Sequence, residues 1–308
     1  MSYYQKLTQS LKTLQQNWHH HWQTLDPSHH WQHDHIQKSH HTNHIYHLEN
    51  GHIFEKACIN YSVLQGDELP QSALPKHMNL SAVGKPFAAT GISTILHPQN
   101  PFVPIAHANL RYFTSLTEPY IWWYGAVIDL NPCYGFVEDC IAWHQGCQQA
   151  CQRVNFDQYP VFKKACDDYF YLPHRQEHRG IGGLWVEYLN TPNQDACESL
   201  LWSIAQHFIT SYSSIVAKRH PLPFQPRHKN FQQLRRARYA EFNLLHDRGT
   251  QFGLKWGGRT ESILASMPPC AKWQYIPSNR LQQNDEKALS FFLKPKNWAD
   301  MSLNTTPA

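Results

Sequence analysis

Three consecutive strand-like segments between residues 87 and 130 constrain the fold more than any other feature of this sequence. The segments are GISTIL, ANLRYFTSL and YIWWYGAVIDL, and their β-branched and aromatic residues favour strands. Pro98, Pro101 and Pro104 separate the first two segments and forbid a regular central strand between them. The sequence shows neither βαβ alternation nor an internal repeat. We therefore predict a single α+β domain with a large, mainly antiparallel β-sheet flanked by helices on both faces.

The remaining elements follow from hydrophobic period and turn residues. Asp26 to Thr42 is polar and poorly periodic, which predicts a loop, and Leu48 to Val63 predicts a hairpin turning at Glu49–Gly51. A second hairpin is expected around Asp247–Gly249, from RYAEFNLLHD and QFGLKW. Helices are predicted over residues 3–23, 137–154, 159–171, 195–218, 229–237 and 286–293. Residues 1–47 then form an N-terminal helix and His-rich connector, and residues 48–308 one compact domain.

Composition excludes several classes of protein. The formal net charge is only +4, and no nucleic-acid-binding motif is present, so nucleic acid is not expected as a partner. No stretch of about 18 apolar residues indicates a membrane span, and the N-terminus has no apolar core of signal-peptide type. The eight cysteines form no CxxC pair, and Cys140, Cys147 and Cys151 share one helix face. We expect reduced, buried thiols and a cytoplasmic protein.

Histidine is unusually abundant near the N-terminus. Of 22 histidines, 12 lie within the first 52 residues. Such a tract can bind metal, but the regular spacing of metal ligands is missing. A metal-binding segment and a solvated connector therefore both remain open.

Four long blocks of unusual composition then follow one another along the chain. They are GISTILHPQNPFVPIAHANLRYF (91–113), WWYGAVIDLNPCYGFVEDCIAWH (122–144), YPVFKKACDDYFYLPHRQEHRGIGG (159–183) and RARYAEFNLLHDRGTQFGLKWGGRTESILASMPP (236–269). In these blocks, their order and their spacing, the chain resembles the oxygen-dependent coproporphyrinogen III oxidases, over roughly residues 48 to 300.

The resemblance implies an oxidoreductase of haem biosynthesis. Such an enzyme converts two propionates of coproporphyrinogen III to vinyl groups, giving protoporphyrinogen IX, with O2 as acceptor and CO2 released. It implies no organic cofactor and leaves a Mn-like divalent metal open. It also implies a homodimer, with residues 239–274 supplying much of the contact. The sequence has no GxGxxG motif after a strand and no P-loop, in agreement with a reaction that needs no nucleotide cofactor.

A substrate with four propionates needs arginines, because guanidinium binds carboxylate bidentately and keeps its charge. Arg111 lies in a predicted strand, and Arg259 follows two glycines that permit close backbone approach. By resemblance, the substrate contacts are Ser93, Asn109, Leu110, Arg111, Gly257, Gly258 and Arg259.

Asp129 is an acid within an apolar run and therefore needs a partner. The partner is either a structural group such as an arginine or, as the resemblance implies, the pyrrole N–H groups of the substrate. The resemblance also assigns His107 as proton donor. It implies metal binding by His97, His107, His144 and His174, a role that imidazole can fill.

A competing motif lies at His174-Arg-Gln-Glu177-His178, which reads as the HxxEH zinc-peptidase signature. Pro173 and Gly180 leave little room for the helix that this signature needs, so we do not adopt it.

The chain also departs from the family pattern. Gly125-Ala126-Val127-Ile128 stands where relatives have more glycine, Asn131 replaces the usual Thr, and SHHTNHIYH (39–47) replaces a glycine-rich run. The alternative function is therefore a divergent paralogue that binds porphyrin or porphyrinogen without turnover.

Overall fold

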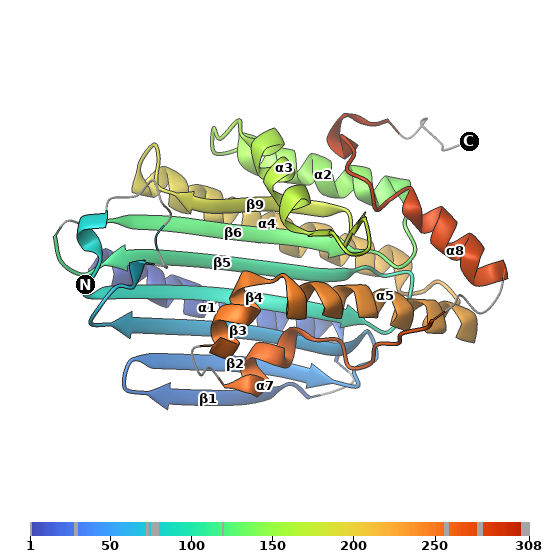
Figure 1. Ribbon diagram of the computed structural model, residues 1–308, viewed down its shortest axis with the longest axis horizontal. Coiled ribbons are helices and arrows are strands. Elements are labelled where there is room, and N and C mark those ends of the chain that lie inside the picture. Colours follow the sequence, from blue (N-terminus) through green and yellow to red (C-terminus); the bar gives the residue numbers. More distant parts are fainter. Residues whose placement is uncertain are drawn as a thin grey trace.

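A seven-stranded antiparallel sheet forms the centre of the protein (Figure 1). The computed structural model describes residues 2–27, 30–71, 74, 80–118, 120–255, 259–275 and 280–302. The strand order is β1-β2-β3-β4-β5-β6-β9, and every neighbouring pair is antiparallel. The strands are β1 (Gln32–Lys38), β2 (His41–Glu49), β3 (Phe54–Gly66), β4 (Phe87–Pro98), β5 (Ile105–Ser115), β6 (Trp122–Asn131) and β9 (Gly182–Leu189), with β7 (Tyr171–Leu172) and β8 (Glu177–His178) pairing separately.

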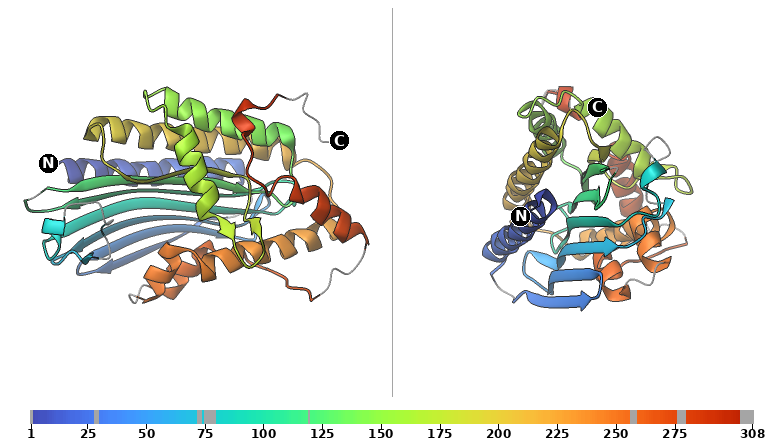
Figure 2. Two further views of the ribbon diagram at one scale, coloured as in Figure 1. Left: turned by 45° about the horizontal axis from the view of Figure 1, so that its top comes forward. Right: turned by 90° about the vertical axis from the view of Figure 1, so that its left-hand side faces the viewer.

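Helices cover both faces of this sheet (Figure 2). The helices are α1 (Tyr3–Leu25), α2 (Val137–Gln152), α3 (Tyr159–Tyr169), α4 (Gln194–Arg219), α5 (Pro226–Leu245), α6 (Arg248–Lys255), α7 (Thr260–Ile263) and α8 (Arg280–Ser290), with 3₁₀ turns η2 (Leu80–Ala82), η3 (Leu264–Ser266) and η4 (Trp298–Asp300). α1, α2 and α4 lie on one side and α5 to α7 on the other, while α3 stands against β9. The predicted α+β class and sheet are confirmed. None of the helices described is both long and apolar enough to cross a membrane.

One face of the sheet is the apolar core. Along β5, alternate residues Ala106, Ala108, Leu110 and Tyr112 are buried in a single cluster with the apolar stripe of α1 and with α4. Side chains of a strand alternate between faces, so the intervening residues of β5 point to the opposite side. Between Ile105 and Phe113 those residues are the polar His107, Asn109 and Arg111, on the side of the sheet where α5 to α7 lie (Figure 2).

Most predicted helices are confirmed. The helices expected at residues 3–23, 137–154, 159–171 and 195–218 correspond to α1, α2, α3 and α4. The segment 229–237 lies inside the longer α5, and residues 286–293 overlap the end of α8. The first hairpin is also confirmed, as β2 and β3.

Two expectations were wrong. The loop predicted over Asp26 to Thr42 contains β1, an exposed edge strand whose polar residues give no hydrophobic period. Stacked imidazoles replace apolar contacts there, as between His35 and His44, whose ring centroids lie 4.3 Å apart. Residues 1–47 therefore contribute strands to the same sheet as the residues that follow them.

The second wrong expectation is the hairpin around Asp247–Gly249, where α5 continues to Leu245 and α6 follows. In this part of α5, Tyr239 and Phe242 are three residues apart and both buried, which is a helical spacing. Polar residues alternate with apolar ones in the same segment and suggested a strand instead.

Candidate functional site

The polar face of β4, β5 and β6 holds the candidate site. Strand register places Ser93 opposite Asn109, and Arg111 between Gly91 and Gly125. Ser93, Asn109 and Arg111 line one hollow of about 240 Å³, to which β3 adds the polar Asn60 and Ser62 and the apolar Leu64. The structure therefore brings together three residues that the sequence had grouped only by resemblance.

Arg111 is the cation of this hollow. Its Nε is buried without a hydrogen-bond partner, and no carboxylate in the described ranges forms an ion pair with it. Gly125 makes room for its side chain, because a Cβ atom there would lie 2.9 Å from Arg111 Nε. Leu110, also expected to contact substrate, buries its side chain in the core on the opposite face. Only the backbone of Leu110 can reach the hollow.

His107 and Asp129 form a pair beside the hollow, on the same face. They are direct cross-strand partners, and His107 Nδ1 lies 2.8 Å from Asp129 Oδ1. The side chain of His107 is 22% exposed and that of Asp129 only 2%. Burial alone would raise the pKa of Asp129, but the Arg179 charge and the His107 hydrogen bond lower it to about 2. Asp129 is therefore ionised at neutral pH.

From the sequence alone, the partner of Asp129 is either an arginine or the substrate. The structure supplies Arg179, whose Nη2 donates to Asp129 Oδ2 at 2.8 Å, and Asn131, whose Nδ2 donates to the same oxygen at 2.7 Å. Neither residue was identified as functional from the sequence. The available signal was the buried acid itself, which required a partner that only tertiary structure could locate.

Of Ala126, Val127 and Ile128, only Val127 shares the face of the sheet that carries Asp129. Ala126 and Ile128 are buried in the core on the other face, so they cannot narrow the hollow. Val127 packs instead with Trp185 and Phe242.

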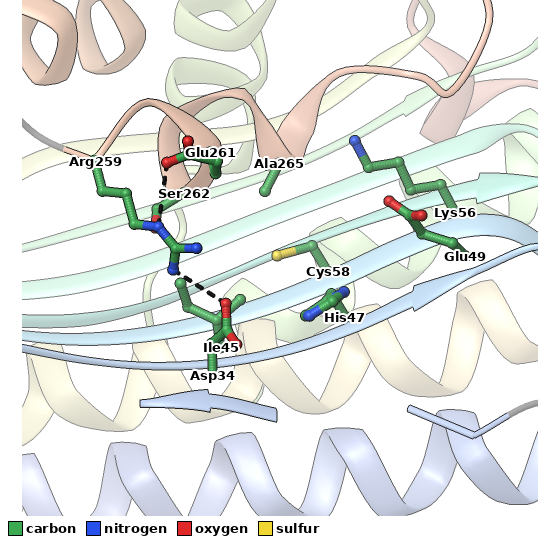
Figure 3. A pocket seen from close by; sticks show the side chains of 10 residues that line it. All are labelled: Asp34, Ile45, His47, Glu49, Lys56, Cys58, Arg259, Glu261, Ser262 and Ala265. Atoms are coloured by element: carbon green, nitrogen blue, oxygen red, sulfur yellow. Dashed lines mark hydrogen bonds and ion pairs between the residues drawn. The ribbon is translucent and has the colours of Figure 1, made fainter. Parts of the chain in front are cut away.

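Arg259 lies in a second hollow of about 180 Å³ on the same face, over β1 to β3 (Figure 3). Its Nη1 contacts Asp34 Oδ2 at 3.0 Å, and its Nε contacts Glu261 Oε2 at 3.1 Å. Lys56 and Cys58 line this second hollow from β3, whereas Asn60 and Ser62 of the same strand line the first. The two hollows are therefore neighbours along β3. Gly257 and Gly258, expected to contact substrate, lie outside the described residues.

The four histidines of the expected metal site do not converge. His97 Nε2 lies 2.9 Å from the Ser266 carbonyl oxygen. Both ring nitrogens of His144 are in use, at 3.0 Å from the Ile181 carbonyl oxygen and 3.0 Å from the Tyr159 hydroxyl.

His174 Nε2 forms a hydrogen bond with Glu241 Oε2 at 2.9 Å. His144 packs beside β9, and β4, which holds His97, is three strand spacings from β9, about 14 Å. Within the ranges that the structure covers, no cluster of three His, Cys, Asp or Glu residues could hold a metal ion. These residues as placed do not suit a shared metal, and no chemical step is derived through one.

The segment around His178 is likewise not a zinc-peptidase helix. Residues 173–176 form turns, and Glu177 and His178 form strand β8. Cys140, Cys147 and Cys151 are buried, as predicted, as are four of the other cysteines, whereas Cys270 is exposed.

Fold and geometry together describe an α+β protein whose sheet presents a candidate site for an organic anion, next to a histidine that can exchange a proton. The family model of coproporphyrinogen III oxidase matches residues 6–298. The chain belongs to this family, as the sequence blocks indicated.

Curated relatives agree with the family model. The oxygen-dependent coproporphyrinogen-III oxidase of Francisella tularensis subsp. holarctica is 47% identical over 253 residues, which cover 82% of this chain and 81% of the relative. The protein of the same name from Francisella philomiragia subsp. philomiragia gives the same values. That of Francisella tularensis subsp. novicida is 47% identical over 254 residues.

Proposed function

We propose that this chain is an aerobic coproporphyrinogen III oxidase of haem biosynthesis, and that its substrate binds across the polar face of β3 to β6. Family membership supports the activity. The observation that supports the location is Arg111, a guanidinium without a carboxylate partner in the described structure, facing a hollow that Ser93 and Asn109 also line. A propionate is the anion that such a group binds best.

The reaction converts each of two propionate side chains to a vinyl group. The carboxylate leaves as CO2, and the side chain also loses one hydride equivalent (two electrons and one proton). O2 accepts this hydride equivalent. The residues of the site bind and orient the macrocycle, and His107 exchanges a proton with it. The chemistry requires O2 as co-substrate.

Substrate binding involves both hollows. The hollow at Arg111 measures about 240 Å³, below the roughly 300–1,000 Å³ of ordinary ligand pockets, whereas a tetrapyrrole with four propionates is a large ligand. The neighbouring hollow adds about 180 Å³ and a second cation, Arg259. Arg259 exchanges Asp34 for a propionate when the substrate enters, whereas Gly257 and Gly258 are included as substrate contacts by family resemblance alone.

The proposal includes a homodimer with contacts in residues 239–274. Leu244, Leu245 and Leu254 on α5 and α6 are 49%, 55% and 43% exposed, and an interface would cover them. It also includes a cytoplasmic location, where free thiols stay reduced.

The test is aerobic incubation of the purified full chain with coproporphyrinogen III, followed by oxidation and chromatographic separation of the porphyrins. Protoporphyrin, in amounts that rise with enzyme concentration, is the expected product. A folded protein that binds the porphyrinogen and forms no product would instead be the non-catalytic paralogue.

A further inference from the structure

Arg179 is a buried arginine held in an aromatic cage. Its side chain is 2% exposed, and its guanidinium carbon lies 4.0 Å from the ring centroid of Phe170, 4.5 Å from that of Tyr239 and 4.7 Å from that of Phe242. Cation–π contacts of this kind strengthen when the groups are desolvated. The cage therefore fixes both the position and the plane of the guanidinium.

The guanidinium in turn fixes the Asp129 carboxylate. Arg179 Nη1 donates to Asn243 Oδ1 at 2.9 Å, and Nη2 donates to Asp129 Oδ2 at 2.8 Å. Asn131 donates to the same Asp129 oxygen at 2.7 Å. Only Oδ1 then remains for His107, at 2.8 Å from Nδ1. The carboxylate is held from one side by Arg179 and Asn131 and presents its other oxygen to the imidazole.

This arrangement decides which nitrogen of His107 is available. An ionised carboxylate only accepts hydrogen bonds, so His107 Nδ1 is the donor and carries its proton. No residue in the described part of the chain bonds Nε2, and the ring is partly exposed on the face that carries the Arg111 hollow. Nε2 is thus the atom through which His107 can exchange a proton with a ligand.

We infer that Arg179 is a positioning residue for the reaction, which acts through Asp129 to hold the His107 ring with Nε2 free for the substrate. The inference rests on the proposed function, and it gives Asp129 a different task from gathering pyrrole N–H groups. The carboxylate already accepts three hydrogen bonds and is almost fully buried. Arg179, which directly precedes Gly180, would thus contribute to turnover without contacting the substrate.

The test compares Arg179→Met with Arg236→Met. Arg236 is a matched control, because it is equally buried and its Nη2 pairs with Glu55 at 2.8 Å, but within the described structure it makes no hydrogen bond or ion pair with His107 or Asp129. For folded protein, Arg179→Met should lower kcat at least about tenfold, within the range of general acid–base catalysis, and leave KM within about twofold. Arg236→Met should lower the unfolding temperature and keep kcat. Arg179→Lys, which retains the charge, should recover part of the kcat.

A second measurement is independent of turnover. In substrate-free protein labelled with ¹⁵N-histidine, the His107 signals, assigned by their loss in His107→Gln, should show a single tautomer protonated at Nδ1. Arg179→Lys should show both tautomers in exchange. Unchanged His107 signals together with an unchanged kcat would overturn the inference. If wild-type protein formed no protoporphyrin, the proposed function would fail instead, and the two failures are thus distinguishable.

Discussion

Arg111 and Arg259 should differ in how much binding free energy each contributes to a propionate, and this difference can be measured. Arg111 has no carboxylate partner in the described structure, so a propionate adds a charge-assisted hydrogen bond of about 1.5–3 kcal/mol. Arg259 already pairs with Asp34, at side-chain exposures of 40% and 44%. A propionate there replaces one exposed ion pair by another, so the net gain in binding is small.

Arg111→Gln should therefore lower kcat/KM for coproporphyrinogen III by roughly ten- to a hundredfold, and Arg259→Gln by less than about fivefold. Initial rates of protoporphyrin formation at fixed O2 give both values. Neither substitution leaves a buried carboxylate unpaired, so thermal unfolding should stay close to that of the wild type. An effect at Arg259 equal to or larger than that at Arg111 would show that Arg111 is not the stronger propionate-binding group.

Further predictions concern the residues around these groups. Gly125→Ala should displace Arg111 and raise KM about tenfold with little change in unfolding temperature, because the new Cβ would lie 2.9 Å from Arg111 Nε; an unchanged KM would contradict this. Asp34→Asn should remove one of the two ion pairs of Arg259 and lower KM by up to about fivefold, and a raised KM would show that Asp34 assists binding. Burial raises the pKa of Glu55, but the charges and hydrogen bonds of Arg236 and Lys229 lower it by more, so the pKa of Glu55 lies below its ordinary value. The Glu55 charge therefore stabilises the fold above the unfolded pKa of about 4.3, and this stabilisation is lost as the pH falls through the lower folded pKa. Glu55→Gln should accordingly reduce the fall in the free energy of unfolding between pH 6 and 3, measured by urea denaturation. Turnover should survive dialysis against a chelator, since His97, His144 and His174 are bonded elsewhere; loss of activity that Mn²⁺ restores would restore the metal hypothesis.

The elements that the sequence predicted well are those whose burial leaves a strong period. Leu7, Leu11, Trp18 and Trp22 of α1 all enter the core, and β4 to β6 are rich in strand-forming residues. β1 was missed because an exposed edge strand of histidines and glutamines has no apolar face. The end of α5 was mistaken for a strand because its buried residues are interrupted by charged ones.

The candidate site could be predicted only in part, for a related reason. Side-chain alternation along β5 already placed His107, Asn109 and Arg111 on one face. Distances across the chain were not accessible from the sequence, so it could not show that Arg179 pairs with Asp129, 50 residues away. The same limit explains the four histidines, whose type suits a metal but whose positions in the fold keep them apart.

The most direct test of the central claim is the release of CO2 from coproporphyrinogen III labelled with ¹⁴C in its propionate carboxyl groups, measured with wild-type protein and Arg111→Gln in air and under nitrogen. We expect labelled CO2 from the wild type in air, at least about tenfold slower release from Arg111→Gln at substrate concentrations below KM, and none from either protein under nitrogen. Porphyrinogen bound by the wild type in air without release of labelled CO2 would contradict the claim, as would release that Arg111→Gln leaves unchanged.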